Sequence, residues 1–348
     1  MNKLMENMSA PVTAVARPPE NKCEFHETNA NTFYLYMFAI TPTSIMGIVL
    51  NAIILIVLGK QQKNAVATSV FLLRILAGCD IFFLLCCLVF FFIRHMVVYF
   101  EHRTAIFTRG DNYIGGDIFY WSIPWYFAAL QSRNGLIVLI TLERFLNIVF
   151  PLWARPYCTE KNFGKAAIGI ILLSLSCNMP TYWFLEQINV SNPCTGNPEV
   201  QIRARPGSRR RTYDSYLYLL GMVVVPLSLV YVMNVVLIIS LRKAIRRRSK
   251  MTGGETGKDQ EEKANRQATL MVVSILIVFT LCETPATVDR LAGLAGLQLF
   301  PDRRYHDYFR KFGLLLIVVD SAMNFVAYCI TNRTFRQNFL SVFRKKIN

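Results

Sequence analysis

The stretch QSRNGLIVLITLERFLNIVFPL, residues 131–152, decides the fold class, because it is apolar enough for a lipid bilayer yet contains two arginines. Arg133 and Arg144 are eleven residues apart, or three helical turns, so both lie on one helix face about 16 Å apart along the axis. Charged residues inside apolar helices are energetically expensive and usually functional. The stretch therefore predicts a membrane-spanning helix with two charged positions that need partners.

Six further apolar runs accompany this one, each about long enough to cross the hydrocarbon core of a bilayer. The seven runs cover residues 34–59, 67–93, 117–150, 163–184, 213–241, 267–296 and 309–331. They predict an all-α membrane protein, a bundle of seven transmembrane helices, rather than a large soluble helical bundle.

A short amphipathic segment follows the last run. Within residues 333–346, Phe335, Phe339 and Phe343 recur every four residues among Arg and Lys, which is typical of a helix lying on the membrane surface. The predicted parts of the chain are an extracellular tail (1–33), a transmembrane domain (34–331), and a surface helix with a cytoplasmic tail (332–348).

The predicted topology places the N-terminus outside the cell. Residues 1–30 are polar and indicate no cleavable signal peptide, so the first run would act as its own insertion signal. The distribution of Lys and Arg favours this orientation only weakly. The glycosylation sequons at Asn7 and Asn189 would then be extracellular, whereas the sequon at Asn332 would be cytoplasmic and is interpreted as chance.

The formal net charge of +16 does not indicate a nucleic-acid partner, because most basic residues flank the apolar runs, where they meet anionic lipid. The basic run at 203–211 either attracts acidic ligands or cell-surface polyanions, or is a solvated loop. The four histidines lie outside the runs or at their outer ends, with no metal-ligand or nucleophile–base spacing. We therefore predict no enzyme activity, no metal and no cofactor.

Single polar residues and prolines occur at specific places in the runs, and together they resemble the rhodopsin-like G protein-coupled receptors. The motifs that carry the resemblance are Glu143-Arg144-Phe145 for that family's Asp-Arg-Tyr, Cys282-Glu-Thr-Pro285 for its Cys-Trp-x-Pro, and Asn324-Phe-Val-Ala-Tyr328 for its Asn-Pro-x-x-Tyr. The resemblance covers about residues 34–346.

Four segments also resemble invertebrate neuropeptide receptors of the FMRFamide-receptor type, at 141–161, 177–186, 278–291 and 323–339. This resemblance implies a plasma-membrane receptor that binds an extracellular peptide and signals to an intracellular heterotrimeric G protein. The alternative function is a transporter or an ion- or proton-conducting protein that uses Asp80, Arg133 and Asp320, although no internal repeat is visible.

The resemblance implies a switch at the inner end of the third run. In the family the arginine matching Arg144 is held by local pairing and then released to contact the G protein; otherwise Arg144 simply reaches lipid headgroups. Pro285 is expected to bend the sixth helix, as part of activation or as a structural kink. Glu283, where the family usually has Trp, either receives a basic ligand group or makes an internal hydrogen bond.

A polar cluster is predicted near the bilayer midplane, formed by Asn51, Asp80, Arg133, Asp320 and Asn324. In the family a sodium ion lies in this region against the second-span aspartate. We hypothesise that Arg133 takes the place of the ion and pairs with Asp80, Asp320 or both, because an unpaired arginine there would be too costly. The alternative is a local rotation that puts Ser132 in that place.

The resemblance also suggests a ligand cleft, with an aromatic residue, Tyr126, where amine receptors have an aspartate. The candidate lining residues are Trp125, Tyr126, Gln131, Tyr218, Glu283, Thr287 and Arg290. The family's usual disulfide lacks one partner, because its place in the third run is Phe119. The two cysteines predicted to be extracellular, Cys23 and Cys194, either form an alternative disulfide or remain free thiols.

Overall fold

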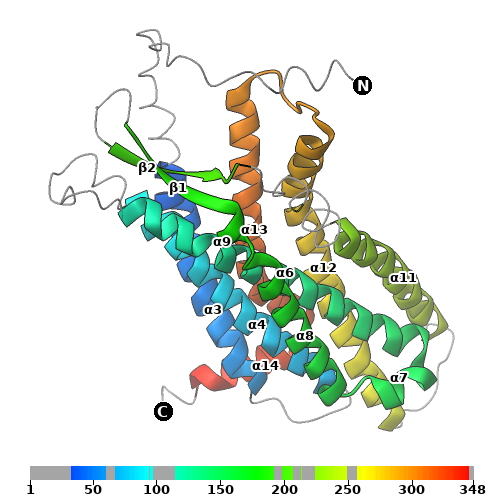
Figure 1. Cartoon of the computed structure of the whole chain (residues 1–348). Helices are drawn as coiled ribbons and strands as arrows, with labels where there is room; N and C mark the ends of the chain where they lie inside the picture. Colours follow the sequence, from blue (N-terminus) through cyan, green and yellow to red (C-terminus); the bar gives the residue numbers. More distant parts are fainter. Residues whose placement is uncertain are drawn as a thin grey trace, which may run out of the picture.

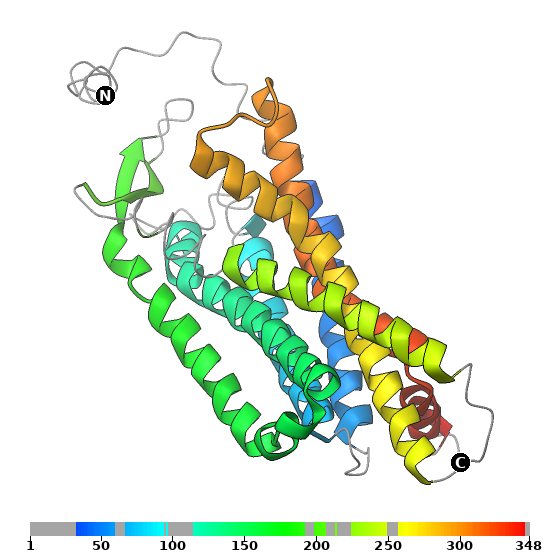
Figure 2. The same ribbon diagram turned by 90° about the vertical axis from the view of Figure 1, so that its right-hand side faces the viewer.

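The computed structural model describes residues 33–59, 67–93, 95–96, 114–191, 198–206, 213, 224–248 and 257–344. Its long helices pack side by side as one bundle (Figures 1 and 2). These helices are α3 (Thr41–Gly59), α4 (Ala67–Cys87), α6 (Ile114–Val149), α8 (Glu160–Asn178), α11 (Val225–Arg248), α12 (Gly257–Ala295) and α13 (Arg303–Thr331). The short elements are η2 (Tyr36–Ile40), η3 (Leu88–Ile93), α7 (Pro151–Tyr157), α9 (Thr181–Phe184) and α14 (Arg333–Arg344).

Each predicted apolar run overlaps one of the long helices, which confirms the all-α membrane fold. Within the described residues, five helical segments are long and apolar enough to span a bilayer, and α11 contributes a shorter apolar segment at Val225–Ser240. Helix α6 carries the charged side chains of Arg133, Glu143 and Arg144, and these lie inside the bundle rather than on its surface. A helical conformation is required here because lipid offers no partners to backbone N–H and C=O groups.

The helices extend beyond the apolar runs at several ends. Helix α12 begins at Gly257, ten residues before the predicted start at 267, and α13 begins at Arg303 rather than 309. Hydrophobicity reports the part of a helix that contacts lipid, and polar turns continue past it. Asp302 caps α13 by accepting a hydrogen bond from the Arg304 N–H at 2.8 Å. At the other end of this connection, α12 ends before Gly296, whose φ of 68° suits glycine.

The two ends of the bundle carry different structures. The amphipathic helix α14 lies across one end, as predicted, and a β-hairpin lies at the other (Figures 1 and 2). The hairpin pairs β1 (Leu185–Ser191) with β2 (Pro198–Ala204) in antiparallel register and was not predicted. Its strand pairing is supported by an ion pair between Arg203 Nε and Glu186 Oε1 at 2.7 Å.

The buried apolar side chains form two clusters. One cluster, toward α14, includes Leu72, Leu136, Leu276 and Tyr328; the other, toward the hairpin, includes Phe83, Phe90, Tyr126 and Ile317. Asp80 on α4, Arg133 on α6 and Asp320 on α13 are buried charged residues, and each falls between members of the two clusters along its helix. The core therefore consists of two apolar layers with a polar layer between them.

Helix α13 approaches α12 closely at Gly313. A Cβ placed there would lie 3.1 Å from the backbone nitrogen of Ala286 and 3.3 Å from its Cα. Backbone cannot move as a flexible side chain can, so a larger residue at this position would push the two helices slightly apart. The close approach positions the two helices that contribute Glu283 and Asp320 to the polar layer.

Candidate functional site

The centre of the polar layer is the guanidinium of Arg133, whose side chain is fully buried. Its Nε donates to Asp80 Oδ1 on α4 at 2.7 Å, and its Nη2 donates to Asp320 Oδ2 on α13. Its Nη1 lies 3.9 Å from Glu283 Oε1 on α12. One guanidinium on α6 therefore contacts carboxylates from three other helices.

Neutral side chains complete the cluster. Asn134 Oδ1 accepts from Arg133 Nη1 at 3.3 Å, and Asn134 Nδ2 donates to Glu283 Oε1 at 3.2 Å. Asn324 Nδ2 donates to Asp80 Oδ2 at 2.7 Å. Buried charges are tolerated only when other groups satisfy their remaining hydrogen-bonding capacity, and these amides serve that purpose.

The five residues predicted for the midplane are not equally close to one another. Hydrogen bonds join Asp80, Arg133, Asp320 and Asn324 to one another, whereas the hydrogen bonds of Asn51 go to backbone oxygens. Its Nδ2 donates to the backbone oxygen of Ser321 at 2.8 Å and so joins α3 to α13 one residue after Asp320.

In the structure the Arg133 side chain pairs with both predicted acidic partners, Asp80 and Asp320. The alternative, a local rotation of α6 that puts Ser132 in this place, is not observed. Ser132 instead lines a groove between α4, α6 and α8. The rotation fails for a physical reason. It would turn a guanidinium out of contact with Asp80 and Asp320 and leave two carboxylates buried without a cation.

A second charged group lies near the α14 end of α6. Arg144 Nε donates to Glu143 Oε2 at 2.6 Å, and Arg144 Nη2 donates to Glu143 Oε1 at 2.7 Å. Ser69 on α4 donates to Glu143 Oε2 at 2.8 Å and accepts from Arg144 Nη2. Both charged side chains are buried, so the arginine is held inside the bundle by its neighbour and by α4.

The remaining motif residues lie around this end. Phe145 is partly buried against the apolar cluster toward α14. Tyr328, which is 1% exposed, packs edge-on against Phe335 of α14 with ring centroids 5.4 Å apart. The Asn332 side chain caps α14 by accepting from the Phe335 N–H at 3.0 Å. The end of α13 is thereby joined to the surface helix.

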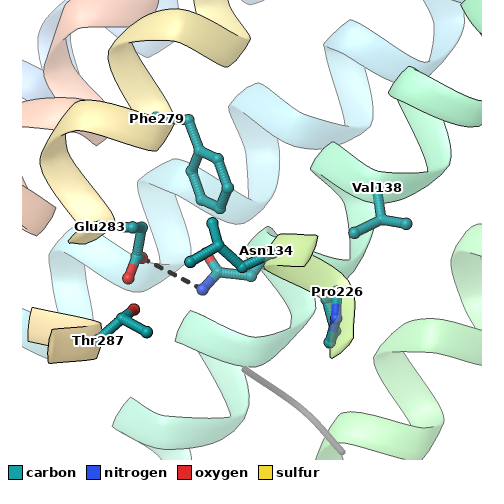
Figure 3. Close-up of a pocket in the computed structure, with 7 residues that line it drawn as sticks. Asn134, Val138, Pro226, Phe279, Glu283 and Thr287 are labelled. Carbon is teal, nitrogen blue, oxygen red and sulfur yellow. Dashed lines mark hydrogen bonds between the residues drawn. The ribbon is translucent and has the colours of Figure 1, made fainter. Parts of the chain in front are cut away.

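Helix α12 runs continuously through Pro285, and Cys282 and Glu283 just before it are buried. Glu283 and Thr287 face a narrow pocket between α6, α11 and α12 (Figure 3). The pocket is lined by Asn134, Val138, Pro226, Leu227, Phe279, Glu283 and Thr287. Its free space is only about that of one water molecule, so no peptide fits without movement of the helices.

The structure does not bring the predicted ligand-cleft residues into one cavity. Trp125 is 45% exposed and lines the groove on the outer face, and Tyr126 is packed against Phe83 and Phe90. Gln131 accepts a hydrogen bond from Asn178 of α8 at 2.6 Å. A helix distributes successive residues around its circumference, so the aromatic residues at the start of α6 do not form one surface.

Other predicted site residues lie partly or wholly outside the described residues. Tyr218, Asn7, Cys23 and Cys194 are in undescribed segments, as is the side chain of Asn189 in β1, so the cleft, glycosylation and disulfide predictions that involve them stay predictions. Arg290 lies seven residues, about two turns, beyond Glu283 in α12.

Noncovalent contacts join the hairpin region to the start of α6. Gln187 Nε2 donates to Asp117 Oδ1 at 2.9 Å, and the Tyr182 hydroxyl donates to the Trp121 carbonyl at 2.8 Å. The Tyr120 hydroxyl donates to the Tyr182 carbonyl at 3.1 Å. The cysteines within the described residues are all free, so the contacts that these residues make between the hairpin region and α6 are noncovalent.

Sequence reasoning missed two residues that connect the charged groups. Ser69 bridges Glu143 and Arg144, and Asn134 bridges Arg133 and Glu283. Asn134 gave a signal, because it is a second polar residue beside Arg133 in an apolar run. Ser69 gave little, because a serine near the end of a transmembrane helix is common and its partners are distant in sequence.

Comparisons with known proteins agree with this arrangement. The family model for the 7 transmembrane receptor (rhodopsin family) matches residues 50–328. The FMRFamide receptor of Drosophila melanogaster is 26% identical over 329 residues, which is 92% of this chain but 56% of that receptor's length. The galanin receptor type 2 of Rattus norvegicus is 26% identical over 304 residues, covering 86% of this chain and 73% of that receptor. The chain belongs to the rhodopsin family of seven-transmembrane receptors.

Proposed function

We propose that the protein is a peptide receptor of the plasma membrane, with its N-terminus outside the cell, that signals to a heterotrimeric G protein. The observation that carries this proposal is the buried ion pair of Glu143 and Arg144 at the α14 end of the bundle. The Ser69 hydroxyl hydrogen-bonds to both side chains of this pair. Membership of the receptor family favours this function over transport or ion conduction.

The geometry of the pair supports a switch. Arg144 is 3% exposed, and its donor groups are directed at Glu143 and Ser69 rather than at solvent. A guanidinium is always charged and presents several donors in a planar fork, so once released it suits backbone carbonyls and carboxylates of a protein partner. Separation of α4 from α6 would break both Ser69 contacts and leave Glu143, on the same helix, as the partner from which a protein partner must draw the guanidinium.

The ligand proposal depends on the relatives. The chain is similar to receptors named for FMRFamide and for galanin, both of them peptides. We infer that the natural ligand is a peptide, and that short peptides amidated at the C-terminus, with a basic residue before the final aromatic one, are the first to test.

The test is a signalling screen. The full chain is expressed in cultured cells, surface expression is measured, and intracellular calcium and cAMP are recorded while a panel of amidated peptides is added. A concentration-dependent response absent from untransfected cells supports the proposal. A receptor that reaches the surface but responds to no peptide in either assay contradicts the ligand proposal. An Arg144→Ala variant that still responds normally contradicts the proposed switch.

A further inference from the structure

Glu283 belongs both to the polar cluster and to the pocket between α6, α11 and α12 (Figure 3). On one side its Oε1 accepts from Asn134 and lies 3.9 Å from the Arg133 guanidinium. On the other side it lines the pocket together with Thr287. A change at this carboxylate therefore reaches the cluster without any intervening side chain.

The charges around Glu283 do not balance. Asp80, Asp320 and Glu283 contribute three carboxylates, against the guanidiniums of Arg133 and of Arg290, which also attracts Glu283. The close contacts of the Arg133 guanidinium are with Asp80 and Asp320. Of the three carboxylates, that of Glu283 lies farthest from this guanidinium. Burial makes the charged form of a carboxyl group costly, so a cation brought beside Glu283 would stabilise its carboxylate.

The pocket also contains a polar group that needs a partner. The Thr287 side chain is 5% exposed, and its hydroxyl makes no hydrogen bond within the described part of the chain. Buried hydroxyls are normally hydrogen-bonded, so this one is available to a bound molecule. It lies one helical turn from Glu283 on the same face of α12, where both side chains point into the pocket (Figure 3).

We propose that Glu283 and Thr287 bind a positively charged group of the activating peptide, and that this binding draws Glu283 away from Asn134 and Arg133. The inference rests on the proposed function and adds the chemistry of the ligand and the first step of its signal. Because the pocket is almost filled in this structure, an entering guanidinium must separate α12 from Pro226 and Leu227 of α11. Ligand entry and helix movement are thus one event.

The experiment combines a ligand change with a receptor change. The probes are the amidated tetrapeptide Phe-Met-Arg-Phe-NH₂, further amidated peptides active in the screen, and the same peptides with citrulline, a neutral isostere, in place of arginine. The receptors are wild type, Glu283→Gln, Thr287→Val and a matched control, Asp289→Asn, which neutralises another acidic residue of α12 that pairs with His306. Surface expression of every variant is measured.

On the wild type and on Asp289→Asn, citrulline is expected to lower potency about 10- to 100-fold, the range for a lost charged hydrogen bond. On Glu283→Gln the arginine peptide loses this advantage, so arginine and citrulline forms differ by less than about threefold. Thr287→Val lowers the potency of the arginine peptide by about threefold to tenfold.

Signalling without ligand tests the second half of the proposal. Glu283→Gln removes the attraction between this side chain and Arg133, and is expected to raise basal G protein signalling about fivefold or more, while Asp289→Asn does not. Unchanged basal signalling overturns the proposed trigger. An equal citrulline penalty on wild type and Glu283→Gln overturns the binding site but leaves the peptide-receptor function intact. Silence of the whole panel on wild type refutes the ligand class, and this assignment with it.

Discussion

Replacement of Arg133 by serine is the most direct test of the polar layer. The substitution leaves Asp80 and Asp320 buried without the guanidinium that contacts both. Removal of one partner from a buried ion pair typically costs about 3–5 kcal/mol, and Arg133 is fully buried, so no solvent screening reduces this cost. We expect the Arg133→Ser receptor to be less stable by at least that range when no small cation is present.

The same substitution is expected to create a sodium site. Without the guanidinium, the carboxylate oxygens of Asp80 and Asp320 and the amide oxygen of Asn134 border the vacated space, and hard cations prefer such ligands. A sodium concentration about ten times the dissociation constant of the site would restore about 1.4 kcal/mol. The wild-type receptor should show no such effect, because its own cation already occupies the position.

The assay is thermal unfolding of the purified receptor in detergent, in sodium chloride and in choline chloride at about 150 mM. The matched control is Arg74→Ser, which removes an exposed arginine from α4. Arg133→Ser should unfold at a lower temperature in choline and recover part of the difference in sodium. An unfolding temperature equal to wild type in choline, or no difference between the two salts, refutes the reasoning.

Three further substitutions test other parts of the structure. Ser69→Ala removes the hydroxyl that bridges the acid–arginine pair, at a cost of about 1–3 kcal/mol, so ligand-independent G protein signalling should rise; an unchanged basal level argues against the switch. Phe335→Ala leaves a cavity beneath α14 and should destabilise the receptor by about 3–5 kcal/mol in thermal unfolding, whereas Leu340→Ala, at an exposed position of the same helix, should have little effect. Gly313→Ala forces α13 away from the α12 backbone at about 1–3 kcal/mol, and Gly293→Ala, where an added Cβ meets nothing within 4 Å, is its control; equal unfolding temperatures for the two variants contradict the close approach.

The transmembrane helices could be predicted because most of them carry an apolar run long enough to span a bilayer, and that requirement leaves a simple pattern. Helix ends could not be predicted as well, since Gly257 and Arg303 begin polar turns beyond the apolar runs. The hairpin was missed because alternation over seven residues is a weak signal inside a long loop.

Part of the candidate site could likewise be predicted from the sequence, and part could not. Arg133 was predictable as a residue in need of acidic partners, because an unpaired guanidinium at that depth is prohibitively costly. The sequence does not predict which of the ligand-cleft residues face the pocket and which face outward. The rotation of α6 about its own axis decides whether Trp125 or Asn134 faces α12. That rotation depends on contacts between helices distant in sequence.

The way one guanidinium serves several carboxylates restricts how this receptor can evolve. Loss of Arg133 alone leaves uncompensated acids, and loss of Asp80 or Asp320 alone leaves the guanidinium with one close partner instead of two. Each single substitution passes through a less stable receptor, whereas a combined change can restore the balance of charge. Related receptors that descend from this one are therefore expected to keep the whole set or to have replaced it together, and intermediate combinations should be rare among them.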